Sequence, residues 1–283
     1  MASTIDLHMH STASDGSDSI PTLLEKLRTV GIYTFSITDH DTVSGALEME
    51  KLVSEEFRYI RGIEFSCVSP QGKCHILGYG YDPSDPVFLE AIRSGNQLRQ
   101  DKLQRRISYL RDSFGILLTH RELNWLHSQK SPGKPHLGRI LADRGLAPNL
   151  SAAIKTYLNL PNEGSDRIPA SLAIRAIAHA GGIPIWAHPL GGEGERQLSK
   201  EKFHAQLETL LSAGLQGLEC FYSRYGKPES DFLLEQADRR GLLISGGSDY
   251  HGANKADLHL GKLSAEDSPV DPGRLTVCSR FSL

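Results

Sequence analysis

The sequence predicts an α/β protein with a parallel sheet. Over most of the chain, short apolar segments that alternate like strands are followed by segments with helical periodicity. Most of the helical segments end at a glycine, the residue that most readily takes the left-handed conformation found after a helix C-terminus. These glycines are Gly31, Gly181, Gly214 and Gly241. Repeated helix–glycine–strand units are typical of a parallel sheet covered by helices.

The individual elements follow from the same patterns. We expect strands at residues 4–8, 34–38, 57–67, 75–81, 184–187, 215–219 and 242–245. Helices are expected between them, at residues 20–30, 44–53, 171–180, 202–213 and 228–240. In parallel α/β proteins the functional residues lie where the strands end, so polar residues that follow a strand are the first candidates for a site.

Residues 92–165 interrupt this alternation and are helical throughout. Helices are expected at 87–114, 119–128, 136–144 and 151–158. We therefore predict an inserted helical subdomain that caps the active site of a domain built from residues 1–91 and 166–283. Between Arg93 and Arg139 the insertion holds ten Lys or Arg against three Asp or Glu, a local charge of +7. This excess indicates either a solvated helix face or a surface that attracts phosphates.

Composition limits the class of protein. The chain has 283 residues, of which 39% are hydrophobic and 23% charged, as expected for a globular enzyme of one domain with an insertion. A net charge of −3 gives no general basic excess for nucleic-acid binding. The four cysteines lack CxxC spacing, which favours reduced thiols. No apolar run approaches the roughly 18 residues of a membrane span, and the N-terminus lacks the apolar region of a signal peptide, so we expect a cytoplasmic protein.

The segment Asp6-Leu7-His8-Met9-His10 is the most informative in the chain. Residues two apart on a strand point to the same face, so His8 and His10 present two imidazoles side by side. Such a pair can bind a metal ion. On these residues alone, an exposed pair of histidines or a tag remnant is an equally good interpretation.

Similar polar residues recur at the ends of the later strands. His40 lies between two carboxylates, Asp39 and Asp41, either of which can orient a ligating imidazole. A lone acidic residue inside an apolar strand needs a partner, and a metal ion is one. Each residue is weak evidence by itself, but a chain in which so many strands carry or end at a His, Asp or Glu is expected to have a metal site. The remaining members of the set are Glu64, His75, His188, Glu219, Asp249 and His251. Asp15 lies in a turn beyond the first strand and, taken by itself, is interpreted as an ordinary turn aspartate.

The other histidines are interpreted as structural or exposed, with one exception. His136 follows Lys134 and Pro135 at the expected start of a helix in the basic insertion. A substrate phosphate can bind at such a helix N-terminus.

Taken together, these motifs resemble the PHP (polymerase and histidinol phosphatase) family of metal-dependent phosphoesterases. The resemblance rests on Asp6-Leu-His8-Met-His10, Thr38-Asp39-His40-Asp41, Ala187-His188-Pro189 and Ser248-Asp249-Tyr-His251, with Glu64 and His75 between them. It implies a distorted (β/α)7 barrel with a trinuclear centre. One metal would take His8, His10, Glu64 and Asp249. A second would share Glu64 and add His75 and His188, and the third would take Asp15, His40 and His251.

Within that family the chain looks most like small stand-alone members with a helical insertion. These include phosphatases of 3′,5′-bisphosphates or AMP and exonucleases of short RNA. The resemblance implies that Lys134, His136 and Arg139 bind a further phosphate. The relatives commonly carry arginine before the Pro-His pair, whereas Lys134 keeps the charge without the two-pronged geometry. The ligand types suit Mn²⁺, Fe²⁺ or Zn²⁺, and the resemblance favours Mn²⁺.

The expected chemistry is hydrolysis of a phosphoester. Clustered divalent ions lower the pKa of water, so hydroxide is the expected nucleophile and no Ser or Cys attacker is needed. Asp249, His251 or His188 would carry the proton, and the sequence does not rank them. The expected partner is a small phosphorylated substrate, with no membrane and no stable protein partner. The alternatives are a histidinol-phosphate phosphatase and a metal-stabilised module without turnover.

Overall fold

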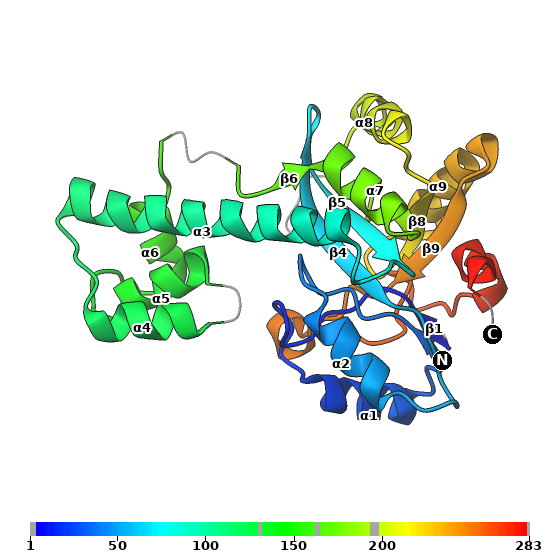
Figure 1. Cartoon of the computed structure of the whole chain (residues 1–283), viewed down its shortest axis with the longest axis horizontal. Coiled ribbons are helices and arrows are strands. Elements are labelled where there is room, and N and C mark those ends of the chain that lie inside the picture. Colours follow the sequence, from blue (N-terminus) through cyan, green and yellow to red (C-terminus); the bar gives the residue numbers. More distant parts are fainter. Residues whose placement is uncertain (1–3, 130–131, 162–164, 193–197, 282–283) are drawn as a thin grey trace. The chain divides into compact units, whose positions relative to one another are not determined.

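The computed structural model describes residues 4–129, 132–161, 165–192 and 198–281, and its elements are shown in Figure 1. The chain divides into two compact units. The first comprises Met1–Ile92 and Pro169–Leu283, and the second comprises Arg93–Ile168. Each unit is described separately below.

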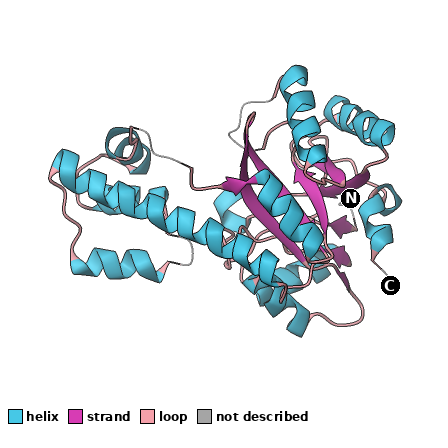
Figure 2. Cartoon of the chain, turned by 45° about the horizontal axis from the view of Figure 1, so that its top comes forward, coloured by secondary structure: helices cyan, strands magenta, loops and turns pink. Residues whose placement is uncertain are grey.

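Strands of the first unit form two sheets. The smaller has the parallel order β1-β2-β3, with β1 at Ile5–Asp6, β2 at Thr34–Phe35 and β3 at Arg58–Tyr59. The larger has the order β6-β4-β5-β7-β8-β9, and the strands of both sheets are drawn in magenta in Figure 2. Its strands are β4 (Gly62–Ser69), β5 (Gly72–Tyr79), β6 (Ile168–Pro169, at the boundary of the two units), β7 (Ile183–Ala187), β8 (Gly217–Tyr222) and β9 (Leu243–Gly247).

Backbone bridges join the two sheets. His40, beyond the end of β2, pairs with Glu64 of β4, and Met9, beyond β1, pairs with Tyr250, beyond β9. The hydrogen bonds therefore run round a closed circuit of strands in the order β1, β2, β4, β5, β7, β8 and β9. The circuit is irregular because two of its junctions are single bridges rather than ladders. It gathers the ends of β1, β2 and β9 beside the middle of β4.

Two expectations about the strands are corrected. β5 is antiparallel to both of its neighbours, β4 and β7, so the large sheet is mixed rather than parallel. The reason is a tight hairpin between Ser69 and Gly72, which reverses the chain without a helix. The expected strand at 57–67 is also two strands: β3 pairs with β2, whereas β4 pairs with β5.

Helices of the first unit begin and end close to the expected residues. They are α1 (Ile20–Val30), α2 (Ser44–Leu52), α7 (Ala170–His179), α8 (Lys200–Ser212) and α9 (Lys227–Arg240), followed by short 3₁₀ turns at Gly252–Lys255, Pro272–Arg274 and Thr276–Arg280. Ser19 caps α1 by accepting a hydrogen bond from the Thr22 N–H, and Gly31 ends the helix in the left-handed conformation, with φ of 79°. Leu23 and Leu27 of α1 are fully buried, which anchors the helix on the core.

The second unit is helical. Helix α3 (Pro86–Phe114) begins in the first unit and is followed by α4 (His120–Ser128), α5 (Lys134–Asp143) and α6 (Leu150–Tyr157). These helices pack around a leucine-rich core that includes Leu110, Leu126 and Leu137, all fully buried. Of the ten basic residues counted in the sequence, Lys130 lies outside the described residues. That this unit caps the site stays a prediction.

None of the helices in the described ranges combines the length and the apolar composition needed to cross a membrane.

Gly247 provides a test of how closely β1 and β9 must approach. A Cβ atom on Gly247 would lie 2.2 Å from Cβ and 2.4 Å from the backbone N of His8. Neither atom can move without displacing the segment that carries His8. We expect Gly247→Ala to lower the free energy of unfolding by roughly 2 kcal/mol or more. Gly273→Ala is the control, since its nearest neighbour would be 3.3 Å away. Equal melting temperatures for the two variants would contradict this account.

Candidate metal centre

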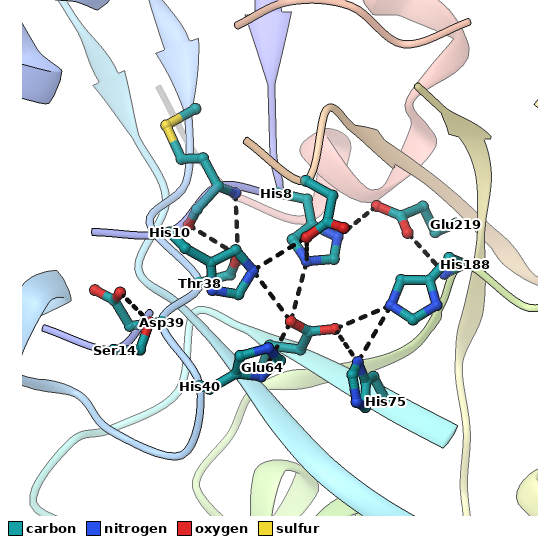
Figure 3. A network of polar contacts seen from close by, with 12 residues as sticks. His8, His10, Ser14, Thr38, Asp39, His40, Glu64, His75, His188 and Glu219 are labelled. Atoms are coloured by element: carbon teal, nitrogen blue, oxygen red, sulfur yellow. Dashed lines mark hydrogen bonds and ion pairs between the residues drawn. The ribbon is translucent and has the colours of Figure 1, made fainter. Parts of the chain in front are cut away.

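The expected ligands converge in the first unit, and Figure 3 shows most of them. Each arrives from a strand or from the residues that follow one. His8, His10 and Asp15 follow β1, His40 follows β2, Glu64 lies in β4, His75 in β5, His188 follows β7, and Asp249 and His251 follow β9. All except Asp15, His40 and His75 are buried.

The carboxylate of Glu64 lies at the middle of the group. Its Oε2 atom is 3.2 Å from Nε2 of His8, 3.2 Å from Nε2 of His10 and 3.3 Å from Nδ1 of His40. Three imidazole nitrogens therefore face one carboxylate oxygen (Figure 3).

The other oxygen of Glu64 faces a second pair of imidazoles. Oε1 is 2.9 Å from Nδ1 of His75 and 3.3 Å from Nε2 of His188, and these two nitrogens are 3.2 Å apart. A carboxylate with nitrogen donors on both sides has the geometry of a bridging ligand between two cations.

The carboxylate of Asp15 faces three imidazoles, one of which is the ring of His10 that also faces Glu64. Its Oδ1 atom is 3.5 Å from Nδ1 of His10 and 3.3 Å from Nε2 of His251, and its Oδ2 atom is 3.8 Å from Nε2 of His40. His10 thus presents one nitrogen to Glu64 and the other to Asp15.

Three overlapping sets of residues can each hold one cation, with all donor atoms of a set within 4.8 Å of one another. One set is identical to the first predicted metal site. Another is the predicted third site with His10 added. The last set consists of His40, Glu64 and His75. His188 is outside this set, but its Nε2 atom lies 3.3 Å from Oε1 of Glu64. The sets are His8, His10, Glu64 and Asp249; His10, Asp15, His40 and His251; and His40, Glu64 and His75.

Several of these donor atoms are buried without a hydrogen-bond partner among the described residues. They are Nε2 of His8, both ring nitrogens of His10, Nδ1 of His40, Oε2 of Glu64 and Nε2 of His251. Buried polar atoms are almost always paired, because an unpaired one costs about 1–3 kcal/mol. Divalent cations would satisfy all of them together, so the donor set fits a multinuclear metal site.

Opposite charges control the titration of the centre. Burial raises the pKa of Glu64, but the imidazoles of His40 and His8 outweigh it and hold the pKa well below its usual range. Burial lowers the pKa of His10, but the neighbouring carboxylates of Asp249, Glu64 and Asp15 raise it to about 9. The carboxylates therefore hold a proton on His10 at neutral pH when no metal is bound.

Glu219 of β8 positions two of the candidate ligands. Its Oε1 atom is 2.9 Å from Nδ1 of His8, and its Oε2 atom accepts a 2.7 Å hydrogen bond from the backbone N–H of His188. The first contact keeps a proton on Nδ1 of His8, which leaves Nε2 free to face Glu64. The sequence identifies Glu219 as a strand carboxylate, but its role depends on contacts between distant segments.

Asp6 holds backbone segments beside the centre in place. Fully buried Asp6 accepts hydrogen bonds from the backbone N–H groups of His8, Ser248 and Gly261, at 3.3, 2.9 and 2.9 Å. It thereby ties the end of β1 to the end of β9.

Asp39 does not orient His40 as the sequence suggested. Its carboxylate accepts hydrogen bonds from the backbone N–H and hydroxyl of Ser11, at 2.8 and 2.7 Å, and from the hydroxyl of Ser14, at 2.6 Å. Asp41 accepts a 3.1 Å bond from the Ser66 N–H. Both carboxylates therefore fix loops beside the centre.

The predicted phosphate ligands lie in the second unit. Lys134 starts α5 and donates a 2.7 Å hydrogen bond to Asn159, while Nδ1 of His136 accepts one of 3.2 Å from the Gly133 N–H. Arg139 is 72% exposed on its side chain. Their role toward a substrate stays a prediction.

Comparison with known proteins identifies the family. A sequence model described as the PHP domain matches residues 6–159, which is more than half of the chain. The chain belongs to the PHP domain family. The matched range holds Glu64 and five of the other candidate ligands, His8, His10, Asp15, His40 and His75.

Curated relatives match nearly the full length of the PHP chain. A 3′,5′-nucleoside bisphosphate phosphatase of Chromobacterium violaceum is 26% identical, over 94% of this chain and 92% of the relative. A phosphoribosyl 1,2-cyclic phosphate 1,2-diphosphodiesterase of Eggerthella lenta is 30% identical, over 90% and 97%. A 5′-3′ exoribonuclease of Haemophilus influenzae is 31% identical, over 89% and 91%.

The fold has solved counterparts. A protein of Bifidobacterium adolescentis, classed by prediction as a metal-dependent phosphoesterase, superposes with a TM-score of 0.76 and 27% identity. The match covers 99% of this chain and 97% of that protein.

Proton competition makes metal binding depend on pH. The pKa of His10 is raised to about 9 in the metal-free protein, so a metal ion must expel a proton at any lower pH. We expect the affinity for Mn²⁺ to rise between pH 6 and pH 8, by about tenfold per pH unit for each proton expelled. Titration calorimetry in buffers of different ionisation enthalpy measures both quantities. An affinity that is constant over this range, with no proton release, would contradict the assignment.

Glu219→Gln tests the positioning of His8 and His188. Glutamine has one acceptor oxygen, so its NH₂ group must face either His8 Nδ1 or the His188 N–H, both of which need an acceptor. We expect a 10- to 100-fold loss of metal affinity, as for other groups that orient metal-bound histidines. Glu208→Gln, at an exposed position of α8, is the control. Unchanged metal content at limiting Mn²⁺ in Glu219→Gln would refute this role.

Proposed function

We propose that this PHP protein hydrolyses a phosphomonoester of a nucleotide, either a 3′,5′-bisphosphate or AMP, or trims the 5′ end of a short RNA, in the cytoplasm. It is a metal-dependent phosphoric ester hydrolase. The observation that carries the proposal is the convergence of imidazoles on both oxygens of Glu64. The bisphosphate phosphatase and exoribonuclease among the relatives support a nucleotide substrate.

We propose three divalent metal ions, with Mn²⁺ favoured. His8, His10, Glu64 and Asp249 would hold one, His75 and His188 would join Glu64 at the second, and Asp15, His40 and His251 would hold the third. The mixture of imidazole and carboxylate donors, without thiolate, suits such ions. When bound, the ions would make water acidic enough to supply hydroxide near neutral pH and would stabilise the charge that develops on the phosphoryl oxygens.

The chain's own residues then place charge and protons. Asp249 directs Oδ1 toward Nε2 of His10 at 3.3 Å, while its Oδ2 accepts hydrogen bonds of 3.1 Å from both the Tyr222 hydroxyl and the Lys255 ammonium. These two donors hold the carboxylate in one orientation.

Asp249, His251 and His188 are the proposed proton carriers. Nδ1 of His251 lies 2.7 Å from the backbone carbonyl of Asp249, which keeps a proton on that nitrogen and turns Nε2 toward Asp15. The buried imidazole of His188, whose Nε2 lies 3.3 Å from Oε1 of Glu64, is the third proposed carrier.

Lys134, His136 and Arg139 are proposed to bind the second phosphate of a bisphosphate, or the next phosphate of an RNA. They occupy the first two turns of α5, whose N-terminal N–H groups and positive dipole end favour an anion. Burial, and then the nearby Arg139 charge, lower the pKa of His136, so it would act as a neutral hydrogen-bond donor.

Phosphate release from a panel of substrates tests the proposal. The Mn²⁺-loaded protein would be assayed with 3′,5′-bisphosphoadenosine, AMP, histidinol phosphate and a 5′-phosphorylated RNA dinucleotide. We expect turnover of at least one nucleotide substrate and a loss of activity of at least 100-fold in Glu64→Gln. Preference for histidinol phosphate would support the alternative phosphatase. No turnover of any substrate, with metal shown to be bound, would contradict the proposal.

A further inference from the structure

A cavity adjoins the candidate metal centre in the first unit. Its volume is about 270 Å³, and His75 and His188 form part of its wall. These are the two imidazoles that face Oε1 of Glu64, on the same side of the carboxylate in Figure 3. A group in this cavity would therefore lie next to any phosphate bound at the centre.

Apolar side chains form most of the remaining wall. Trp186 of β7 is held in place by stacking on Phe203 of α8, with ring centroids 5.2 Å apart and planes inclined by 12°. Pro189 and Leu198 also line the cavity. Lys73, which is exposed, also lines the cavity, whereas the apolar part of the wall around Trp186 suits a flat, uncharged group.

Gln206 of α8 is the unexplained polar group of this wall. Its side chain is 1% exposed, and neither its Oε1 nor its Nε2 has a hydrogen-bond partner in the described part of the chain. Leaving both groups unpaired costs about 1–3 kcal/mol each. Gln236 of α9 is comparably buried, but its Oε1 accepts a hydrogen bond from Arg240. Of these two buried glutamines, the one that lines the cavity is therefore the one whose amide lacks a partner in the described part of the chain.

We propose that the cavity binds the nucleobase of the substrate and that the Gln206 amide pairs with the edge of the base. An amide offers one acceptor beside one donor, the pattern that pairs with the adjacent donor and acceptor on a base edge, such as N6 and N7 of adenine. This inference rests on the proposed nucleotide phosphoesterase. It adds the part of the substrate that is recognised and the residue that recognises it.

The geometry separates this role from phosphate binding. His75 and His188 belong both to the cavity wall and to the candidate metal centre, so a sugar would connect a phosphate at the centre to a base in the cavity. A base-free substrate would still reach the metals but would leave Gln206 unpaired. Gln206 would then determine specificity without touching the phosphate.

Comparison of AMP with ribose 5-phosphate tests the proposal, because ribose 5-phosphate keeps the sugar and the phosphate and has a hydroxyl in place of the base. We expect Gln206→Leu to lower kcat/KM for AMP by roughly tenfold or more and to leave ribose 5-phosphate within about twofold. Gln236→Leu is the matched control, a buried glutamine on another helix, and should leave the ratio of the two substrates unchanged.

Binding of adenosine provides a readout that needs no turnover. Adenosine should raise the melting temperature of the Mn²⁺-loaded wild type, because a ligand that binds only the folded state stabilises it, and should raise that of Gln206→Leu less. Without ligand, Gln206→Leu should be at least as stable as the wild type, since the substitution removes two unpaired buried groups.

Two results would overturn the proposal. One is a ratio of AMP to ribose 5-phosphate activity in Gln206→Leu equal to that of the wild type, including an equal loss for both substrates, which would make Gln206 a support of the centre alone. The other is no adenosine-induced shift in the wild type. Failure of the phosphoesterase proposal is distinct, since it would appear as no phosphate release from any substrate.

Discussion

The buried carboxylate of Glu64 is the group on which the rest of the centre depends. Both of its oxygens lie within 3.3 Å of imidazole nitrogens, from five histidines carried by four different strands or their ends. An ionised carboxylate in this environment is unfavourable unless cations surround it. Without metal, the protonated imidazole of His10 supplies part of that charge, and divalent ions would supply it with metal.

The fold brings these groups together by closing the strand circuit beside Glu64. The bridges at His40 and Met9 join the two sheets, and each bridge lies within one residue of a candidate ligand. Asp6 and Glu219 then tie the ends of β1, β7 and β9 to one another through buried hydrogen bonds. Stability and metal binding therefore depend on the same contacts, so most substitutions near Glu64 should affect both.

Much of this arrangement could be predicted from the sequence. Helical periodicity and terminal glycines give α1 at residues 20–30 as observed, and strand-end residues meet because neighbouring strands end at one edge. The antiparallel β5 was missed because a two-residue hairpin leaves little signal in an apolar pattern. The contacts of Asp39 with Ser11 and Ser14 and the unpaired amide of Gln206 depend on tertiary packing, which periodicity does not contain.

The proposed bridging role of Glu64 can be tested directly by anomalous diffraction from crystals of the Mn²⁺-loaded protein, recorded at the manganese absorption edge. We predict anomalous peaks at bonding distance from both carboxylate oxygens, one toward His8 and His10 and the other toward His75 and His188. Peaks confined to one oxygen, or manganese bound elsewhere with Glu64 uncoordinated, would contradict the account.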